Sequence, residues 1–114
     1  MRMEGEGKLL RIFIGESDQY HGKALYQAIV ELVRKEGLAG ATVLRGIEGF
    51  GADSRIYTTR VLRLSEDLPV VIEIVDTEEN IDRILPQLDA MVGEAMLTVE
   101  RVHIIAYRGG ETTG

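Results

Sequence analysis

The chain has 114 residues, of which 45% are hydrophobic and 28% charged, and its net charge is −6. This composition predicts a single soluble domain spanning residues 1–114, and its acidic balance argues against a nucleic-acid binder, which needs a basic surface. No apolar run is long enough to cross a membrane, and the absence of cysteine excludes disulfides and thiolate chemistry. We therefore expect a cytoplasmic protein that is not membrane-embedded.

Four strands and two helices are expected along the chain. Apolar alternation predicts a strand at residues 8–14, and a 3.6-residue stripe predicts a helix at about 23–35. The remaining elements are a strand at about 41–50, a strand at 68–75, a helix capped by Asp76 with Glu79 in a capping box, and a strand at 99–107. The order β-α-β-β-α-β predicts an α+β, ferredoxin-like sandwich with a core at about 8–108 and a flexible tail at 109–114.

One face of the predicted sheet has no cover within the chain. Two helices cover one face only, and Leu9, Phe13 and Ile105 are assigned to the other. This apolar surface is too large to leave in water, so we expect an oligomer.

The segment between the second and third strands, about 52–67, is much longer than the two to five residues of a typical hairpin loop. It is expected to be mobile, and its candidate docking residues are Arg55, Tyr57, Arg60 and Arg63. Long loops of this kind often carry function. The alternative, that the arginines are only solubilising charge, stays open.

Several motifs resemble the nitrogen regulatory PII superfamily. They are "GFG" at 49–51 closing the second strand, the long loop, "LPVVIEIV" at 68–75, "ERV" at 100–102 and "RGGE" at 108–111. The fuller string from "GEGKLLRIFIG" to "GIEGFG" resembles an uncharacterised PII-like branch of bacteria and archaea. The resemblance covers about residues 8–111.

The resemblance implies a homotrimer with three ligand sites in the clefts between subunits. PII trimers bind adenine nucleotides there, and their long loop docks on a target, often a transporter or an enzyme. A small anionic metabolite such as AMP or ADP is therefore the expected ligand. The positions that match the family's site are Gly49, Phe50 and Gly51 at the loop base, Ile74 in the strand beside the nucleotide, and Arg108 as the phosphate partner from an adjoining subunit.

Departures from the family pattern narrow this expectation. PII proteins have a glycine-rich stretch with a phosphate-binding lysine before the last strand, whereas "MVGEAMLTV" here has Gly93 alone and no lysine. One or two phosphates should therefore fit better than three. Tyr57, in "RIYTTR", lacks the context of the tyrosine that some PII proteins have modified.

Other candidate ligand residues have two interpretations each. His21 and Lys23 could hold an anion at a helix amino end or belong to a solvated loop. Arg101 is a candidate anion partner, and His103 on the same face is expected to pack in an interface. The glycines of "RGIEGFG" permit close approach of a ligand, or else a bend or subunit packing.

Signalling is expected rather than catalysis. No carboxylate pair stands out as acid and base, the serines have no glycine-flanked elbow, and two histidines are too few for a metal site. The leading interpretation is a ligand sensor that regulates a partner through its long loop. The rivals are a subunit-interaction protein without a small ligand, and a small enzyme that uses the intersubunit cleft.

Overall fold

The computed structural model describes residues 2–50 and 67–109. In chain order the elements are β1 (Arg2–Gly15), β2 (Gln19–Tyr20), β3 (Lys23–Ala24), α1 (Leu25–Lys35), β4 (Thr42–Arg45), β5 (Pro69–Asp76), α3 (Glu78–Met91) and β6 (Met96–Arg108). The predicted mobility of the loop at 52–66 and of the tail at 110–114 concerns segments outside the described residues.

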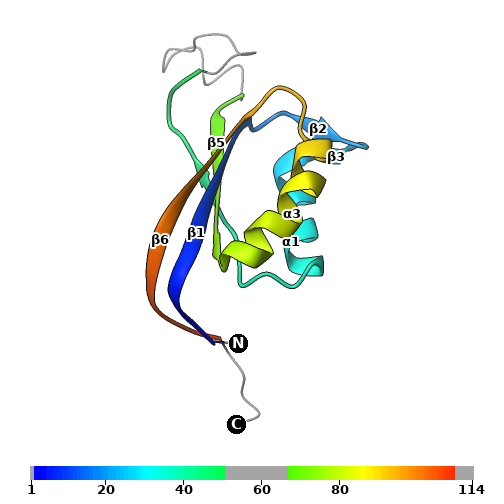
Figure 1. The fold of residues 1–114 in the computed structure, drawn as a ribbon. Coiled ribbons are helices and arrows are strands. Elements are labelled where there is room, and N and C mark those ends of the chain that lie inside the picture. The colour runs from blue at the N-terminus through cyan, green and yellow to red at the C-terminus, as the bar shows by residue number, and fades with distance from the viewer. Residues whose placement is uncertain (1, 51–66, 110–114) are drawn as a thin grey trace.

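Strands β1, β4, β5 and β6 form one sheet in the order β4-β5-β1-β6, and each neighbouring pair is antiparallel. Helices α1 and α3 lie together on one face of this sheet (Figure 1). The predicted ferredoxin-like α+β fold is therefore confirmed. The short β2–β3 hairpin, which the sequence patterns did not predict, stands between β1 and α1.

Strand alternation builds the core between the sheet and the helices. Leu10, Ile12 and Ile14 of β1 alternate with more exposed neighbours, as the period of two requires. Their partners in the core are Val70, Ile72 and Ile74 of β5, Leu25, Ile29 and Val33 of α1, Leu38 after α1, and Ile81, Ile84 and Leu88 of α3. Each fully buried aliphatic side chain contributes about 1.5–3 kcal/mol relative to exposure, so this layer carries most of the fold's stability.

Two strands are longer than the sequence patterns indicated. The glycines and charges of "RMEGEG" weaken the strand signal, yet β1 runs through them because β6 supplies hydrogen-bonding partners along the ribbon. Gly7 is required there, since a Cβ at this position would lie 2.8 Å from the backbone carbonyl oxygen of Asp76. The pairing register shifts between Met3 and Gly5, where Gly5 has a φ of 99°.

The cap of α3 differs from the predicted one. Thr77, not Asp76, is the N-cap, and its hydroxyl accepts a hydrogen bond from the Asn80 backbone N–H at 3.2 Å. Asp76 is instead fully buried as the last residue of β5. Its carboxylate accepts from the backbone N–H of Ala39 at 2.8 Å, the N–H of Thr77 at 2.7 Å and the side-chain amide of Asn80 at 2.8 Å. Tertiary contact with the segment after α1 therefore takes this carboxylate away from the capping role.

The sheet face opposite the helices is partly apolar and has a charged centre. Leu9 and Phe13 lie on it, and Arg11 between them donates to Glu73 at 3.0 Å and to Glu100 at 2.7 Å. The hydrogen bonds that Arg11 donates to Glu73, the larger effect, and to Glu100 raise the pKa of Arg11. Other apolar side chains on or beside this face are Leu44, Val75 and Met96, all exposed in the single chain.

Ile105 does not lie on this face, contrary to the prediction from the sequence. In the register, Val102 and Ile104 pair with Gly7 and Gly5, which alternate on the same side as Leu9. Ile104 therefore lies on the open face. The prediction, which placed Ile105 there, was wrong by one residue. The β1–β6 ribbon is irregular at this point, so simple alternation from the sequence fails.

Candidate functional site

A cavity of about 610 Å³ lies at the end of the sheet where β1 ends and β5 and β6 begin. Phe13 and Leu97 form part of its apolar wall, and Phe50, 65% exposed, borders it from the segment that leads into the long loop. Gly49 also lines it, whereas Gly51 lies outside the described residues. Two of the three expected loop-base residues thus meet at one hollow, which we call the loop-base cavity.

The glycines that precede the loop pack against Pro69. A Cβ at Gly46 would lie 2.8 Å from the Pro69 Cγ, and one at Gly49 would lie 3.2 Å from the same atom. The Gly46 N–H donates to the Pro69 carbonyl at 2.7 Å. β4 ends at Arg45 rather than near residue 50, because the chain folds over the proline ring here. Close packing accounts for Gly46, while Gly49 both packs and lines the cavity.

Acidic side chains give the loop-base cavity its charge. Asp18, Asp67 and Glu94 line it, and no lysine, arginine or histidine does so among the described residues. The Gly15 N–H donates to Asp18 at 3.0 Å, and the Ser17 N–H donates to Asp67 at 3.2 Å. Within the described part of one chain, this environment favours hydrogen-bond donors and opposes phosphate. A bound phosphate needs cations from elsewhere.

These carboxylates escaped the sequence analysis. Asp18 and Asp67 stand in polar segments and Glu94 in the apolar stretch "MVGEAML", none of them in a distinguishing motif, and the three segments are far apart in the chain. A Cβ at Gly15 would lie 2.8 Å from Oδ1 of Asp67, so the glycine is what allows the carboxylate so near the end of β1. The glycine after "RIFI" was the one available signal.

Ile74 lies away from this cavity. It is fully buried between the sheet and the helices. Its side chain therefore stabilises the core.

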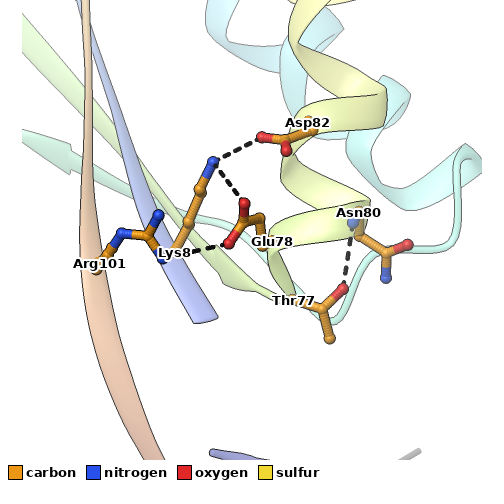
Figure 2. A network of polar contacts seen from close by, with 6 residues as sticks. All are labelled: Lys8, Thr77, Glu78, Asn80, Asp82 and Arg101. Atoms are coloured by element: carbon orange, nitrogen blue, oxygen red, sulfur yellow. Dashed lines mark hydrogen bonds and ion pairs between the residues drawn. The ribbon is translucent and has the colours of Figure 1, made fainter. Parts of the chain in front are cut away.

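Arg101 lies in an ion-pair network at the start of α3. Figure 2 shows the Lys8 ammonium group between Asp82, at 2.8 Å, and Glu78, at 3.7 Å, while Arg101 donates to Glu78 at 3.4 Å. The hydrogen bond that Lys8 donates to Asp82 raises the pKa of Lys8. Arg101 is thus already paired with a carboxylate, and it lies on a different part of the molecule from the lining of the loop-base cavity.

Arg108 is the last residue of β6, at the opposite end of that strand from the cavity, and it pairs in register with Arg2. The cavity borders Met96 at the beginning of the same strand, so roughly 40 Å of extended chain separates the two positions. One chain cannot bring Arg108 to its own loop-base cavity. His103 is also exposed, with Nδ1 4.0 Å from a Glu6 carboxylate oxygen.

His21 and Lys23 lie in and beside the turn of the β2–β3 hairpin. Lys23 donates to Glu31 of α1 at 2.7 Å, and His21 stacks on Tyr20. Helix α1 begins at Leu25, whose N–H donates to the Asp18 carbonyl at 2.8 Å. This N–H is therefore not available to an anion at the amino end of the helix. The two residues line a separate groove along the helices.

Two further findings concern the described residues alone. They contain no group of three or more histidine or acidic side chains placed to hold a metal ion. None of the helices there is long and apolar enough to span a bilayer. The candidate docking residues Arg55, Tyr57, Arg60 and Arg63 lie outside the described ranges.

Comparison with known sequences gives a family. Residues 7–104 match the model of the family DUF190, described as "Uncharacterized ACR, COG1993". The chain is 37% identical over 105 residues to a UPF0166 protein of Methanocaldococcus jannaschii, covering 91% of this chain and 94% of the other. It is 40% identical over 98 residues to a UPF0166 protein of Aquifex aeolicus, covering 86% and 92%.

Comparison with solved structures gives the same fold. CPII of Thiomonas intermedia, a nitrogen regulatory PII-like protein solved with ADP, AMP and bicarbonate, matches with a TM-score of 0.59 at 14% identity, over 87% of this chain and 94% of that one. A PII-like signaling protein of Thermus thermophilus matches with a TM-score of 0.64 at 23% identity, over 90% and 94%. The chain therefore belongs to the DUF190 family, and it has the same ferredoxin-like fold as these PII-like proteins.

Proposed function

We propose that the protein is a PII-like ligand sensor that binds an adenine nucleotide, AMP or ADP, at the loop-base cavity between subunits. The observation that carries this proposal is the cavity itself, about 610 Å³ at the base of the long loop, a size suited to a small-molecule ligand. CPII, which shares the fold, was solved with ADP and AMP. Ligand binding would change the relative populations of the conformations of the loop at 52–67, and the loop would thereby regulate a partner.

The cavity has two kinds of lining, and each suits a different part of a nucleotide. The apolar wall, with Phe13 and Leu97, suits a nucleobase, and the carboxylates of Asp18 and Glu94 can accept hydrogen bonds from ribose hydroxyls or an amino group. The same carboxylates repel phosphate, so each added phosphate costs affinity. This supports AMP or ADP over ATP, as the missing glycine-rich lysine segment also does.

The phosphate needs a cation from another copy of the chain. Arg108 is exposed at the far end of β6 and can reach a cavity only on a neighbouring subunit. A homotrimer supplies this arrangement and also covers the open sheet face around Leu9 and Phe13. Arg11 is already neutralised by Glu73 and Glu100 there, which lowers the cost of covering it.

Calorimetry with AMP, ADP and ATP tests the proposal. A charge-assisted hydrogen bond from Arg108 is worth roughly 1.5–3 kcal/mol, so Arg108→Ala should weaken AMP or ADP binding roughly 10- to 150-fold without changing the oligomer. Arg34→Ala, on an exposed helix position outside the cavity lining, is the matched control and should leave affinity unchanged.

Absence of binding by all three nucleotides at millimolar concentration would refute the sensor proposal. The rival subunit-interaction protein would then be favoured, because the exposed apolar side chains of the open sheet face support it independently of any ligand. Turnover of a bound nucleotide would instead identify a small enzyme.

A further inference from the structure

A second hollow, separate from the loop-base cavity, lies between the β2–β3 hairpin and helices α1 and α3. Its volume is about 460 Å³, within the range of small-molecule sites. None of its lining residues is shared with the loop-base cavity. We call it the hairpin groove, and Figure 1 shows the hairpin standing beside the ends of the two helices.

The floor of the hairpin groove is apolar. Ala28 and Leu32 contribute from α1, and Ala90 and Met91 contribute from α3. Ala28 is 7% exposed, whereas Ala90 is exposed at the edge. The small alanine side chains leave the space between the helices open, so an apolar group can lie against both helices at once.

The wall of the groove is an aromatic pair on the hairpin. The rings of Tyr20 and His21 stack with centroids 4.0 Å apart and planes 16° apart. His21 has a φ of 49°, the only positive value at a non-glycine among the described residues, and Gly22 follows with 84°. Positive φ at both central positions is the pattern of a type I′ turn, whose central positions prefer glycine, asparagine and aspartate. Histidine is one of the residue types that adopt positive φ more often than most, and here its ring stacks on Tyr20.

The charge of the rim favours an anion. Lys23 is neutralised by Glu31 at 2.7 Å, but the Lys35 ammonium group has no hydrogen bond or ion pair with a described residue. The groove therefore carries an unpaired cation in a chain whose net charge is −6. A simpler explanation for a lysine at position 35 is that its charge interacts favourably with the dipole of α1, because Lys35 stands in the last turn of that helix. Arg34 beside it would serve that role equally well.

We propose that the hairpin groove is a second ligand site that takes a planar ring bearing a carboxylate. The ring lies on the floor formed by Leu32 and Met91, beside the Tyr20–His21 wall, and the carboxylate pairs with Lys35. This site is independent of the nucleotide proposal, because it uses other residues on another surface.

Amide NMR titration of the whole protein tests the site with 2-naphthoate as the probe and 2-naphthamide as its neutral match. We expect 2-naphthoate to shift the amide signals of the hairpin and of α1, and to bind about two- to fivefold more tightly than the amide, as an exposed ion pair allows. Lys35→Gln should abolish this preference. Arg34→Gln, which removes the same charge from the same helix end, should preserve it.

Ala90→Trp separates this site from the other one. The position is exposed, so the larger ring should fill the groove, abolish the 2-naphthoate shifts and leave AMP calorimetry unchanged. The proposal is overturned if the probe gives no shifts at millimolar concentration, if acid and amide bind equally, or if binding survives Ala90→Trp. None of these outcomes bears on nucleotide binding at the loop-base cavity.

Discussion

Replacing Asp76 by asparagine tests what the buried carboxylate does. The side chain is fully buried and accepts from three donors, two at Oδ1 and one at Oδ2. Asparagine has nearly the same shape but offers only one acceptor oxygen. Its best orientation keeps the oxygen toward Thr77 and Asn80 and turns the amide NH₂ toward the Ala39 N–H, so two donors then face each other.

The expected cost follows from that geometry. One hydrogen bond to a charged acceptor is lost, worth roughly 1.5–3 kcal/mol, and the Ala39 N–H is left without its partner. Against this, asparagine avoids burying a charge, which relieves part of the desolvation penalty. Because three good hydrogen bonds already compensate that penalty, we expect Asp76→Asn to lower the free energy of unfolding by roughly 2–4 kcal/mol.

Urea unfolding at fixed protein concentration, followed by far-UV circular dichroism, measures the difference. Asp89→Asn on the exposed surface of α3 is the matched control and should lie within about 0.5 kcal/mol of the parent. A neutral or stabilising effect of Asp76→Asn would refute the reasoning. It would mean that desolvation of the charge outweighs its hydrogen bonds.

Three further predictions concern packing, assembly and the loop. Gly46→Ala should cost about 1–3 kcal/mol through overlap with Pro69, whereas Gly40→Ala, with nothing within 4 Å, should be tolerated; thermal unfolding of both variants compares them. Light scattering coupled to size-exclusion chromatography should give three times the chain mass of 12.6 kDa, and a monomer at micromolar concentration would contradict the trimer. Residues 52–66 have few apolar anchors in their sequence and should exchange amide hydrogen quickly in the free protein; uniformly slow exchange would favour a permanent assembly hairpin.

The order of elements and the core could be read from the sequence because they depend on local periodicity. The strand predicted at 8–14 buries Leu10, Ile12 and Ile14 in the core, and the helix predicted after Asp76 buries Ile81 and Ile84. Both patterns persist in the fold because burial of an apolar face is what the sheet and helices share. The motif at 49–51 likewise predicted where the base of the long loop would be.

Local patterns predicted the ends of the strands less well. β1 continues through Gly5 and Gly7 only because β6 lies beside it, and β4 stops early only because Gly46 meets Pro69. The role of Asp76 was decided in the same way, since the donor of Ala39 reaches it from a segment 37 residues away.

The candidate site was likewise predictable in part from local patterns and in part only from the fold. Local patterns in the sequence were enough to predict the fold, the uncovered sheet face around Leu9 and Phe13, and the position of the loop base. Only the tertiary structure separated Arg101 and Arg108 from the loop-base cavity and brought Asp18, Asp67 and Glu94 to it. Periodicity reports which face of an element is buried, whereas the charge of a cavity depends on which distant segments meet there, and packing decides that.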